Sequence, residues 1–417
     1  MRRVRSTASG DLVALLTGRA TFSAFSGIAM CAPDSILGIV QDFRRDPAPN
    51  KVNLAIGVYR DDANRPFVLE SVKRADTGAD MEYSPVIGIP AFLELSQKLC
   101  FGETCTALRD GRVASCQALG GTGALRLGGE LLRRFVDNCP FIYGTDVGYA
   151  NHPGIFSAAG INLKPYAYYN ASTRALNLHG MLQSLEDLPE RSVVLLHACA
   201  HNPTGVDPTM EEWKKVCEVL ERRKHLPFVD MAYQGFATGD VERDGFLPRY
   251  LVDRVPNLIV AQSFSKSFGL YGHRCGALHV VAGNSTEAKC IASQLAVLIR
   301  STYSNPPLYG ARVVASILNS PELRALWLDE LRQMSDRIAS VRKRLVQELK
   351  TCGSSHDWSH IERQIGMMAF TGLSKEQVLE LRDKHKVYMT LNGRAAVSGL
   401  NTMNVAYVAR AIHDVTK

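Results

Sequence analysis

The stretch Ser263-Phe-Ser-Lys266-Ser-Phe-Gly269 follows the apolar run Leu258-Ile-Val-Ala261, with Gln262 between them. A short, fully apolar run of this kind predicts a strand buried in a sheet. A lysine just beyond such a strand can lie in a cleft with its amine partly desolvated. Desolvation lowers the pKa of a lysine, so that the free amine can attack a carbonyl carbon. The heptapeptide alone leaves open a second interpretation, a surface lysine in a serine-rich turn.

A fixed cation, Arg274, follows Lys266 in the next stretch of the chain. The planar guanidinium of arginine is well suited to bind a phosphate. A lysine that can form a Schiff base and an arginine that can bind a phosphate together suggest pyridoxal 5'-phosphate (PLP), because this cofactor carries both an aldehyde and a phosphate.

The wider pattern predicts an α/β fold. Thr209 and Glu212 predict a capped helix, and Ser374 and Gln377 predict the start of another near the C-terminus. Helical patterns of this kind alternate with apolar runs. Such alternation predicts a largely parallel sheet with helices on both faces. From Ser320 the pattern changes to a long helix ending near Lys350, which places a domain boundary near residue 320. The runs that predict buried strands are Phe141–Tyr143, Val193–His197, Phe228–Asp230, Leu258–Ser263 and Ala277–Val281.

Composition narrows the class of protein. The 417 residues are 46% hydrophobic and 21% charged, with a formal net charge of +7. These values are typical of a globular protein and give no argument for a nucleic-acid partner or a membrane-spanning protein. The ten cysteines form no CxxC pair, which favours reduced thiols. His197, Cys199 and His201 have no second ligand cluster, so we expect no metal site.

Residues 1–28 have a different composition from the rest of the chain. They contain four arginines and many serines and threonines, and Asp11 is their one acidic residue. This composition is typical of a mitochondrial transit peptide, and the alternatives are an unaddressed cationic tail and a cytoplasmic protein. The apolar patch Leu12–Leu16 is too short to span a membrane.

Three further motifs lie where open α/β sheets bind ligands. Gly120-Gly-Thr-Gly123 precedes a helix pattern near Leu125, and glycines let the backbone approach a phosphate at a helix N-terminus. Asp230 ends an apolar run, where its carboxylate can keep a pyridine nitrogen protonated or can simply cap a turn. Asn202 and Tyr233 can each donate a hydrogen bond to a phenolate oxygen.

These motifs follow one another as in the fold-type I PLP-dependent aminotransferases, and the chain most resembles the aspartate-specific class I branch of that family. The resemblance runs from about Pro33 to the C-terminus. The residues that carry it are Gln117-Ala-Leu-Gly-Gly-Thr-Gly-Ala-Leu-Arg, Ala150-Asn-His-Pro, Asn202-Pro-Thr-Gly, Asp230-Met-Ala-Tyr, Ser263-Phe-Ser-Lys, Arg274, Tyr303-Ser-Asn-Pro-Pro and Asn392-Gly-Arg.

The resemblance implies the domain organisation. We expect a large PLP-binding domain with a mostly parallel sheet at 65–320. A smaller α/β domain would be built from both chain ends, 29–64 and 321–417. The family also implies a homodimer whose two active sites lie at the subunit interface.

The resemblance assigns the cofactor-binding residues as well. Lys266 would hold PLP and move the substrate proton, while Asp230 would pair with the pyridine nitrogen, with His152 behind it. Asn202 and Tyr233 would bond the phenolate oxygen, and Tyr149 would stack on the ring. The residues expected to hold the phosphate are Gly121, Thr122, Ser263, Arg274 and, from the second subunit, Tyr83.

The implied reaction is reversible amino transfer between aspartate and 2-oxoglutarate, giving oxaloacetate and glutamate. Arg394 would bind the substrate α-carboxylate by a two-pronged pair, and the backbone at Gly57 would close over it. Arg300 from the neighbouring subunit would bind the side-chain carboxylate. Tyr149 and Asn202 would also contact the substrate.

The sequence departs from the family pattern at several positions. Gly120 replaces a common serine, Tyr149 a usual tryptophan and Met368 a usual phenylalanine, and Gly272-His273 replaces a more polar pair. These changes leave open an aromatic amino acid aminotransferase. Two further alternatives are a β-lyase, against which Arg300 argues, and a catalytically silent relative.

Overall fold

The computed structural model describes residues 29, 32–77, 82–136 and 139–417. The predicted transit peptide, 1–28, lies outside these residues. Residues Ser35–Lys417 form one compact unit, and the description that follows concerns this unit.

Its helices and strands are, in chain order, α2 (Leu37–Arg45), β1 (Val52–Asn53), α3 (Glu70–Arg74), α4 (Pro90–Phe101), α5 (Thr106–Arg109), β2 (Val113–Leu119), α6 (Gly120–Phe135), β3 (Phe141–Thr145), α7 (His152–Ala158), β4 (Asn162–Tyr166), β5 (Tyr169–Asn170), β6 (Ala175–Leu176), α8 (Leu178–Asp187), β7 (Val193–His197), α9 (Met210–Arg222), β8 (Leu226–Met231), α10 (Val241–Asp244), α11 (Phe246–Leu251), β9 (Leu258–Ser263), β10 (Cys275–Val281), α12 (Ser285–Thr302), α13 (Leu308–Asn319), α14 (Pro321–Thr351), α15 (Ser359–Arg363), β11 (Met368–Phe370), α16 (Lys375–His385), β12 (Val387–Tyr388), β13 (Arg394–Ala396) and α17 (Val405–Val415). Short 3-10 turns occupy Tyr271–His273 and Val397–Gly399.

A seven-stranded sheet lies at the centre, with the strand order β2-β10-β9-β8-β7-β3-β4. The pairs from β9 through β8, β7 and β3 to β4 are parallel, whereas β10 runs antiparallel to both β2 and β9. All five predicted strands are confirmed, and β7 and β9 have the predicted bounds. The α/β class with a largely parallel sheet is therefore correct.

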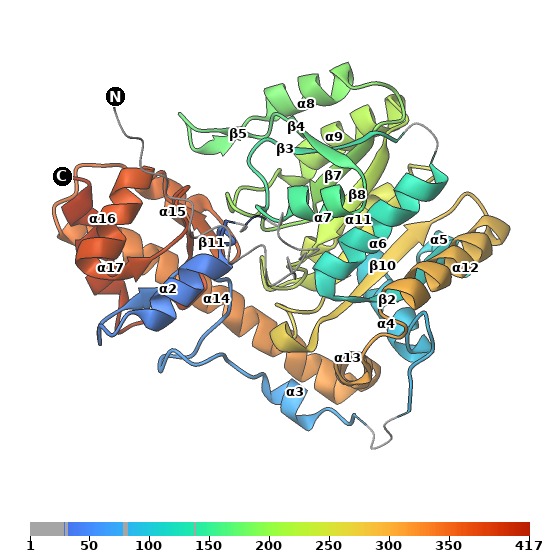
Figure 1. Ribbon diagram of the computed structural model, residues 1–417, viewed down its shortest axis with the longest axis horizontal. Coiled ribbons are helices and arrows are strands. Elements are labelled where there is room, and N and C mark those ends of the chain that lie inside the picture. The colour runs from blue at the N-terminus through green and yellow to red at the C-terminus, as the bar shows by residue number, and fades with distance from the viewer. Residues whose placement is uncertain (1–28, 30–31, 78–81, 137–138) are drawn as a thin grey trace, which may run out of the picture. The chain divides into compact units, whose positions relative to one another are not determined.

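Helices cover both faces of this sheet (Figure 1). Side chains of a strand alternate between the two faces, so Val193 and Leu195 pack in the core under α6, α7 and α12. Val194 and Leu196 pack on the opposite face with α8, α9 and α11. The sheet is buried on both sides, which explains why its parallel strands read as continuous apolar runs.

The predicted helix caps are also confirmed. The Thr209 hydroxyl accepts a hydrogen bond from the Glu212 amide at 3.2 Å, and the Glu212 carboxylate accepts one from the Thr209 amide at 2.7 Å. The Ser320 hydroxyl caps α14, and a second capping box joins Ser374 and Gln377 at the start of α16.

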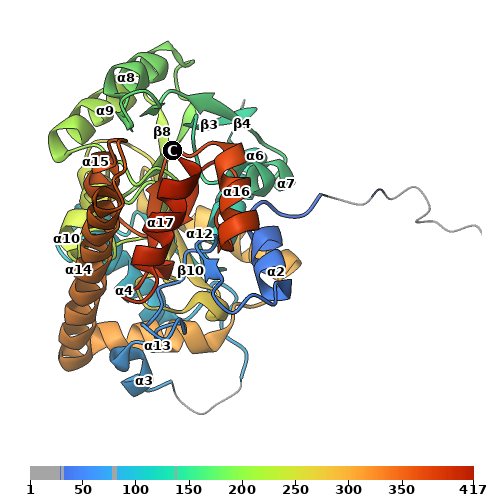
Figure 2. The same cartoon turned by 90° about the vertical axis from the view of Figure 1, so that its left-hand side faces the viewer.

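The long helix α14 contacts α13 and α3 as well as α15 and α17 (Figures 1 and 2). Beside it, β11 pairs antiparallel with β13. The short strand β1, from the N-terminal part of the unit, pairs in parallel with β12, 335 residues further along the chain. This pairing supports a small domain built from both chain ends, and the boundaries at 64 and 320 stay predictions.

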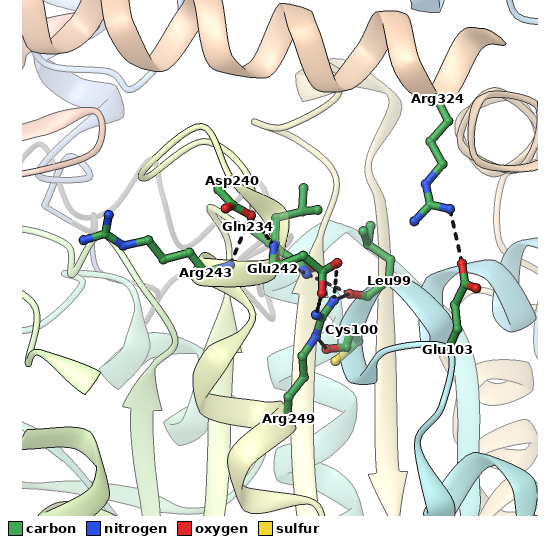
Figure 3. A network of polar contacts seen from close by, with 10 residues as sticks. Leu99, Cys100, Glu103, Gln234, Asp240, Glu242, Arg243, Arg249 and Arg324 are labelled. Carbon is green, nitrogen blue, oxygen red and sulfur yellow. Dashed lines mark hydrogen bonds and ion pairs between the residues drawn. The ribbon is translucent and has the colours of Figure 1, made fainter. Parts of the chain in front are cut away.

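A polar network holds the loop that follows β8 (Figure 3). The Gln234 amide donates to the carbonyl oxygens of Leu99 at 2.7 Å and Val241 at 3.2 Å. Arg249 donates to the carbonyl oxygens of Leu99 at 3.0 Å and Cys100 at 3.2 Å, and it pairs with Glu242. These donors satisfy the last carbonyls of α4, which lack partners within the helix. The network thereby fixes the backbone next to Tyr233.

Candidate functional site

The predicted site residues gather at the carboxyl edge of the parallel strands. Strand register aligns His197 of β7 with Asp230 of β8, and Asp230 with Ala261 of β9. The segments carrying Asn202, Tyr233 and Lys266 leave these neighbouring strands at the same edge. Open α/β sheets bind their ligands at this edge.

Asp230 lies buried in contact with a histidine. The Nε2 atom of His152 is 2.9 Å from Oδ2 of Asp230. Burial alone would raise the pKa of Asp230, but the hydrogen bond and charge of His152, together with His197 and Lys266, hold this pKa below its ordinary value. The carboxylate therefore stays ionised, as a partner for a protonated pyridine nitrogen must.

Lys266 has the properties of a reactive amine. Its side chain is half-buried, and burial, with help from the charges of Arg274 and Arg394, lowers its pKa to about 8, although Asp230 opposes this shift. The Nζ atom lies 5.6 Å from the centre of the Tyr233 ring. Burial raises the pKa of Tyr233, which keeps its phenol neutral and able to donate a hydrogen bond.

The start of α6 and Arg274 form a cradle for an anion. Helix α6 begins at Gly120 directly after β2, so its first amide groups have no partner within the helix. One Arg274 nitrogen, Nη1, donates to Ser265 Oγ at 3.2 Å and to the Tyr271 carbonyl oxygen at 3.0 Å. A Cβ atom at Gly121 would lie 3.1 Å from Ser263 Cβ.

The structure explains one departure from the family pattern. Gly120 has a positive φ of 69°, and a Cβ atom there would lie only 2.5 Å from Arg274 Nη2. A serine at this position would be strained and would displace the guanidinium. The glycine thus permits the close approach of Arg274. The start of α6 therefore brings together the hydroxyl groups of Ser263 and Ser265, backbone amides and the Arg274 guanidinium. These groups fit the phosphate of PLP.

A second cation, Arg394, lies buried at the start of β13 with 4% of its surface exposed. Burial lowers its pKa, although Tyr233 and Tyr149 oppose this shift. Its Nη2 atom donates to the Ala55 carbonyl oxygen, two residues before Gly57, and its Nε atom has no partner. Within the described ranges, no carboxylate forms an ion pair with it. A buried cation that the protein leaves unneutralised can receive an anionic ligand.

The remaining residues predicted near the cofactor ring lie at the same edge. The Tyr149 ring meets the His152 ring edge-on, with 5.2 Å between the centroids. Asn202 is buried, whereas Thr122 is exposed at the start of α6. Met368 is buried, and a Cβ atom at Gly57 would lie 2.4 Å from its Cε atom.

The two residues predicted to act across a subunit interface, Tyr83 and Arg300, have other surroundings than Lys266, Asp230 and Arg394. Tyr83 is 82% exposed, and Arg300, exposed at the end of α12, donates to Ser304 Oγ. In the part of the chain that the structure describes, no hydrogen bond or ion pair links either one to Lys266, Asp230 or Arg394. Tyr83 and Ser304 line one surface pocket of about 530 Å³.

Two residues that contact the candidate site were not predicted from the sequence. Ser265, inside the opening heptapeptide, accepts a hydrogen bond from Arg274. His197 packs on His152 with 5.3 Å between ring centroids, and its place at the end of β7 in register with Asp230 was the available signal. Among the described residues, no cluster of three or more histidine, cysteine or acidic side chains could hold a metal ion. No helix there is long and apolar enough to cross a bilayer.

Comparison with known proteins places these features in a family. The family model of the aminotransferase class I and II proteins matches residues 49–412. The chain is 45% identical to the mitochondrial aspartate aminotransferase of Xenopus tropicalis over 410 residues, which are 97% of this chain and 96% of the relative.

Solved structures agree with the curated relatives. A mitochondrial aspartate aminotransferase from Trypanosoma brucei is 68% identical and superimposes with a TM-score of 0.90, over 91% of this chain and all of that one. An aromatic amino acid aminotransferase from Burkholderia pseudomallei, covalently bound to pyridoxal phosphate, is 41% identical with a TM-score of 0.91, over 95% of this chain and all of that one.

Proposed function

The chain belongs to the class I and II aminotransferase family, and on this premise we propose that it is a PLP-dependent aspartate aminotransferase. It exchanges amino groups between aspartate and 2-oxoglutarate and forms oxaloacetate and glutamate. The relatives named above support this substrate pair. One observation supports it most: Arg394 is a buried cation without a protein carboxylate in the described ranges, on the same site as Lys266 and Asp230.

The residues fit the cofactor at both of its ends. The amides of Gly121 and Thr122, with Ser263 and Arg274, would hold the phosphate. Asp230 would pair with the pyridine nitrogen, and Asn202 and Tyr233 would bond the phenolate oxygen, while Tyr149 would cover the ring. When bound, PLP supplies an aldehyde for the amino group and a ring that withdraws electrons from the substrate Cα atom.

Lys266 performs the proton transfers. With a pKa of about 8, its Nζ atom is roughly one-tenth neutral at pH 7, against roughly three in ten thousand for an ordinary lysine. The neutral amine can hold the cofactor and then take the proton from the substrate Cα atom. Burial is the main cause of this lowered pKa, and Arg274 and Arg394 add to it by disfavouring a further positive charge nearby.

Arg394 and Gly57 orient the substrate by its α-carboxylate. The guanidinium can bind both carboxylate oxygens, which fixes the direction of the Cα–H bond relative to Lys266. The side-chain carboxylate of aspartate needs a second cation, and the partner subunit's Arg300 would supply it. The partner subunit's Tyr83 would complete the phosphate site. The proposed enzyme is therefore a homodimer.

Aromatic amino acids are the second candidate substrates. The Burkholderia pseudomallei neighbour is named for them, and Met368 and Tyr149 differ from the residues expected in the aspartate-specific branch. The relatives named mitochondrial support import into mitochondria as the location, with residues 1–28 as the signal.

A purified preparation tests the proposal. The protein should bind PLP and turn yellow, and its rate with aspartate and 2-oxoglutarate should exceed its rate with phenylalanine or tyrosine. A colourless protein after incubation with PLP would refute the cofactor. A preference for aromatic donors would replace the aspartate assignment with the second candidate.

A further inference from the structure

Arg342 is a further buried arginine, next to the segment that leads into the strand paired with Arg394. Arg342, in α14, is 2% exposed. Its Nη1 atom donates to the Ile361 carbonyl oxygen at 3.3 Å, and Nη2 donates to the carbonyl oxygens of Ile365 at 3.4 Å, Gly366 at 2.7 Å and Met368, while Nε has no partner. No carboxylate within the described residues pairs with it. Burying a charge is unfavourable unless hydrogen bonds compensate for it, and here the backbone of 361–368 provides them.

This segment touches the loop on the cofactor side. The Ile365 amide donates to the Gly205 carbonyl oxygen at 2.8 Å. A Cβ atom at Gly366 would lie 2.4 Å from Ala200 Cβ, and one at Gly205 would lie 2.9 Å from the Met368 carbonyl oxygen. Ala200 and Gly205 flank Asn202, so the contacts hold the segment against the Asn202 loop.

The same segment touches the carboxylate-binding side. The Met368 side chain lies against Gly57, where a Cβ atom would be 2.4 Å from Met368 Cε. In the small sheet, Met368 pairs with Ala396 and Phe370 pairs with Arg394. Residues 365–368 therefore form a joint between the Asn202 loop and the Arg394 strand, and we call them the joint segment.

We propose that Arg342 is a positioning residue for aminotransfer, because it fixes the joint segment and so sets the distance between Arg394 and the cofactor residues. The inference rests on the proposed function. Arg342 touches neither substrate nor cofactor in this account. Its planar guanidinium donates to four carbonyl oxygens, a geometry that a lysine ammonium on a flexible stem does not reproduce.

The Michaelis constant should report this role. If Arg394 is slightly misplaced relative to the cofactor, it binds the substrate α-carboxylate in a poorer position. A misplacement of this kind can lower catalytic efficiency by up to about a hundredfold. In Arg342→Met we expect KM for aspartate and 2-oxoglutarate to rise about tenfold to a hundredfold. In Arg342→Lys we expect a smaller rise. The affinity of the cofactor-free protein for PLP, measured by absorption titration, should fall by a smaller factor than KM rises. The phosphate-binding residues Arg274 and α6 lie apart from the joint segment, while Asn202, one cofactor residue among several, lies in the loop that the segment contacts.

Arg337 provides a matched control on the same helix. It donates to the Arg60 carbonyl oxygen at 2.7 Å and pairs with Asp62 at 2.8 Å, so Arg337→Met also removes a backbone contact and a cation. We expect this variant to lose thermal stability without a change in KM. Gly366→Ala offers an independent perturbation, because its Cβ would push against Ala200 while Arg342 stays in place. It should raise KM in the same way.

If Arg342→Met does not fold, the KM values of Arg342→Lys and Gly366→Ala test the positioning role. Unchanged KM values in folded variants with lowered melting temperatures would overturn the positioning role, because Arg342 would then serve stability alone. A wild-type protein without aminotransferase activity would overturn both the proposed function and this inference. If the wild-type protein is active and the variants keep its KM values, only the positioning role of Arg342 is overturned.

Discussion

Replacing Arg394 by methionine should strongly lower activity without destabilising the cofactor-free protein. Arg394 is 4% exposed, its Nε atom has no partner, and no ion pair neutralises its guanidinium in the described part of the chain. Such a charge is unfavourable in the empty protein, and apolar replacements of buried ionic groups are often neutral or stabilising. In the proposed enzyme the favourable partner would be the substrate carboxylate, so the benefit of Arg394 is expected in binding and catalysis.

The magnitude follows from the loss of one member of a buried charge pair. Such truncations cost about 2–5 kcal/mol, which corresponds to roughly one and a half to three and a half decades in kcat/KM. Every amino acid carries an α-carboxylate, so aspartate and phenylalanine should lose by similar factors. Arg394→Lys keeps the charge but not the two-pronged geometry, and we expect an intermediate loss.

The assay combines kcat/KM for aspartate and phenylalanine with melting temperatures of the cofactor-free variants. We expect a large fall in both specificity constants and an unchanged or higher melting temperature. A variant that keeps activity within about threefold of wild type would refute the reasoning, since an effect that small lies below the range expected for a buried pair. A strongly lowered melting temperature would show that Arg394 supports the fold.

Three other predictions concern specificity, pH and location. Arg300→Ala should lower kcat/KM for aspartate by about one and a half to three and a half decades and leave phenylalanine nearly unchanged; equal losses on both substrates would assign Arg300 to the interface or the fold. Burial raises the pKa of Asp207 from 3.8 to about 6. Between these pH values the folded protein holds a proton that the unfolded chain releases, so Asp207 should make the free energy of unfolding fall as pH rises. Asp207→Asn should remove that contribution in urea melts at several pH values, and identical slopes in both proteins would contradict it. Residues 1–30 fused to a fluorescent protein should direct it to mitochondria, and a diffuse cytosolic signal would refute the targeting prediction.

The sequence predicted the elements whose local signal is strong. β7 and β9 are continuous apolar runs because both of their faces are buried, and Thr209-to-Glu212 and Ser374-to-Gln377 are caps formed by neighbours in the chain. The motif residues Asp230 and Lys266 were expected at the carboxyl edge because strands end just before or at them.

Other features were outside the reach of local patterns. β2 was not predicted, since Ser115 and Gln117 interrupt its apolar residues. Ser115 is buried in a hydrogen bond with His279 of β10 at 2.7 Å, a partner far away in the chain. The antiparallel direction of β10 leaves no mark on periodicity. The need for glycine at position 120 depends on where Arg274 lies, and the roles proposed for Arg300 and Tyr83 would depend on a second copy of the chain.

Turnover by Lys266→Ala shows whether this amine holds the cofactor and moves the substrate proton. The measurement is the rate with aspartate and 2-oxoglutarate at saturating PLP, beside circular dichroism and melting temperature to establish that the variant is folded. We predict a folded protein whose kcat falls by at least two to four decades, the range for loss of a general acid–base group. A folded Lys266→Ala variant with kcat within about tenfold of wild type, well short of that range, would contradict the account.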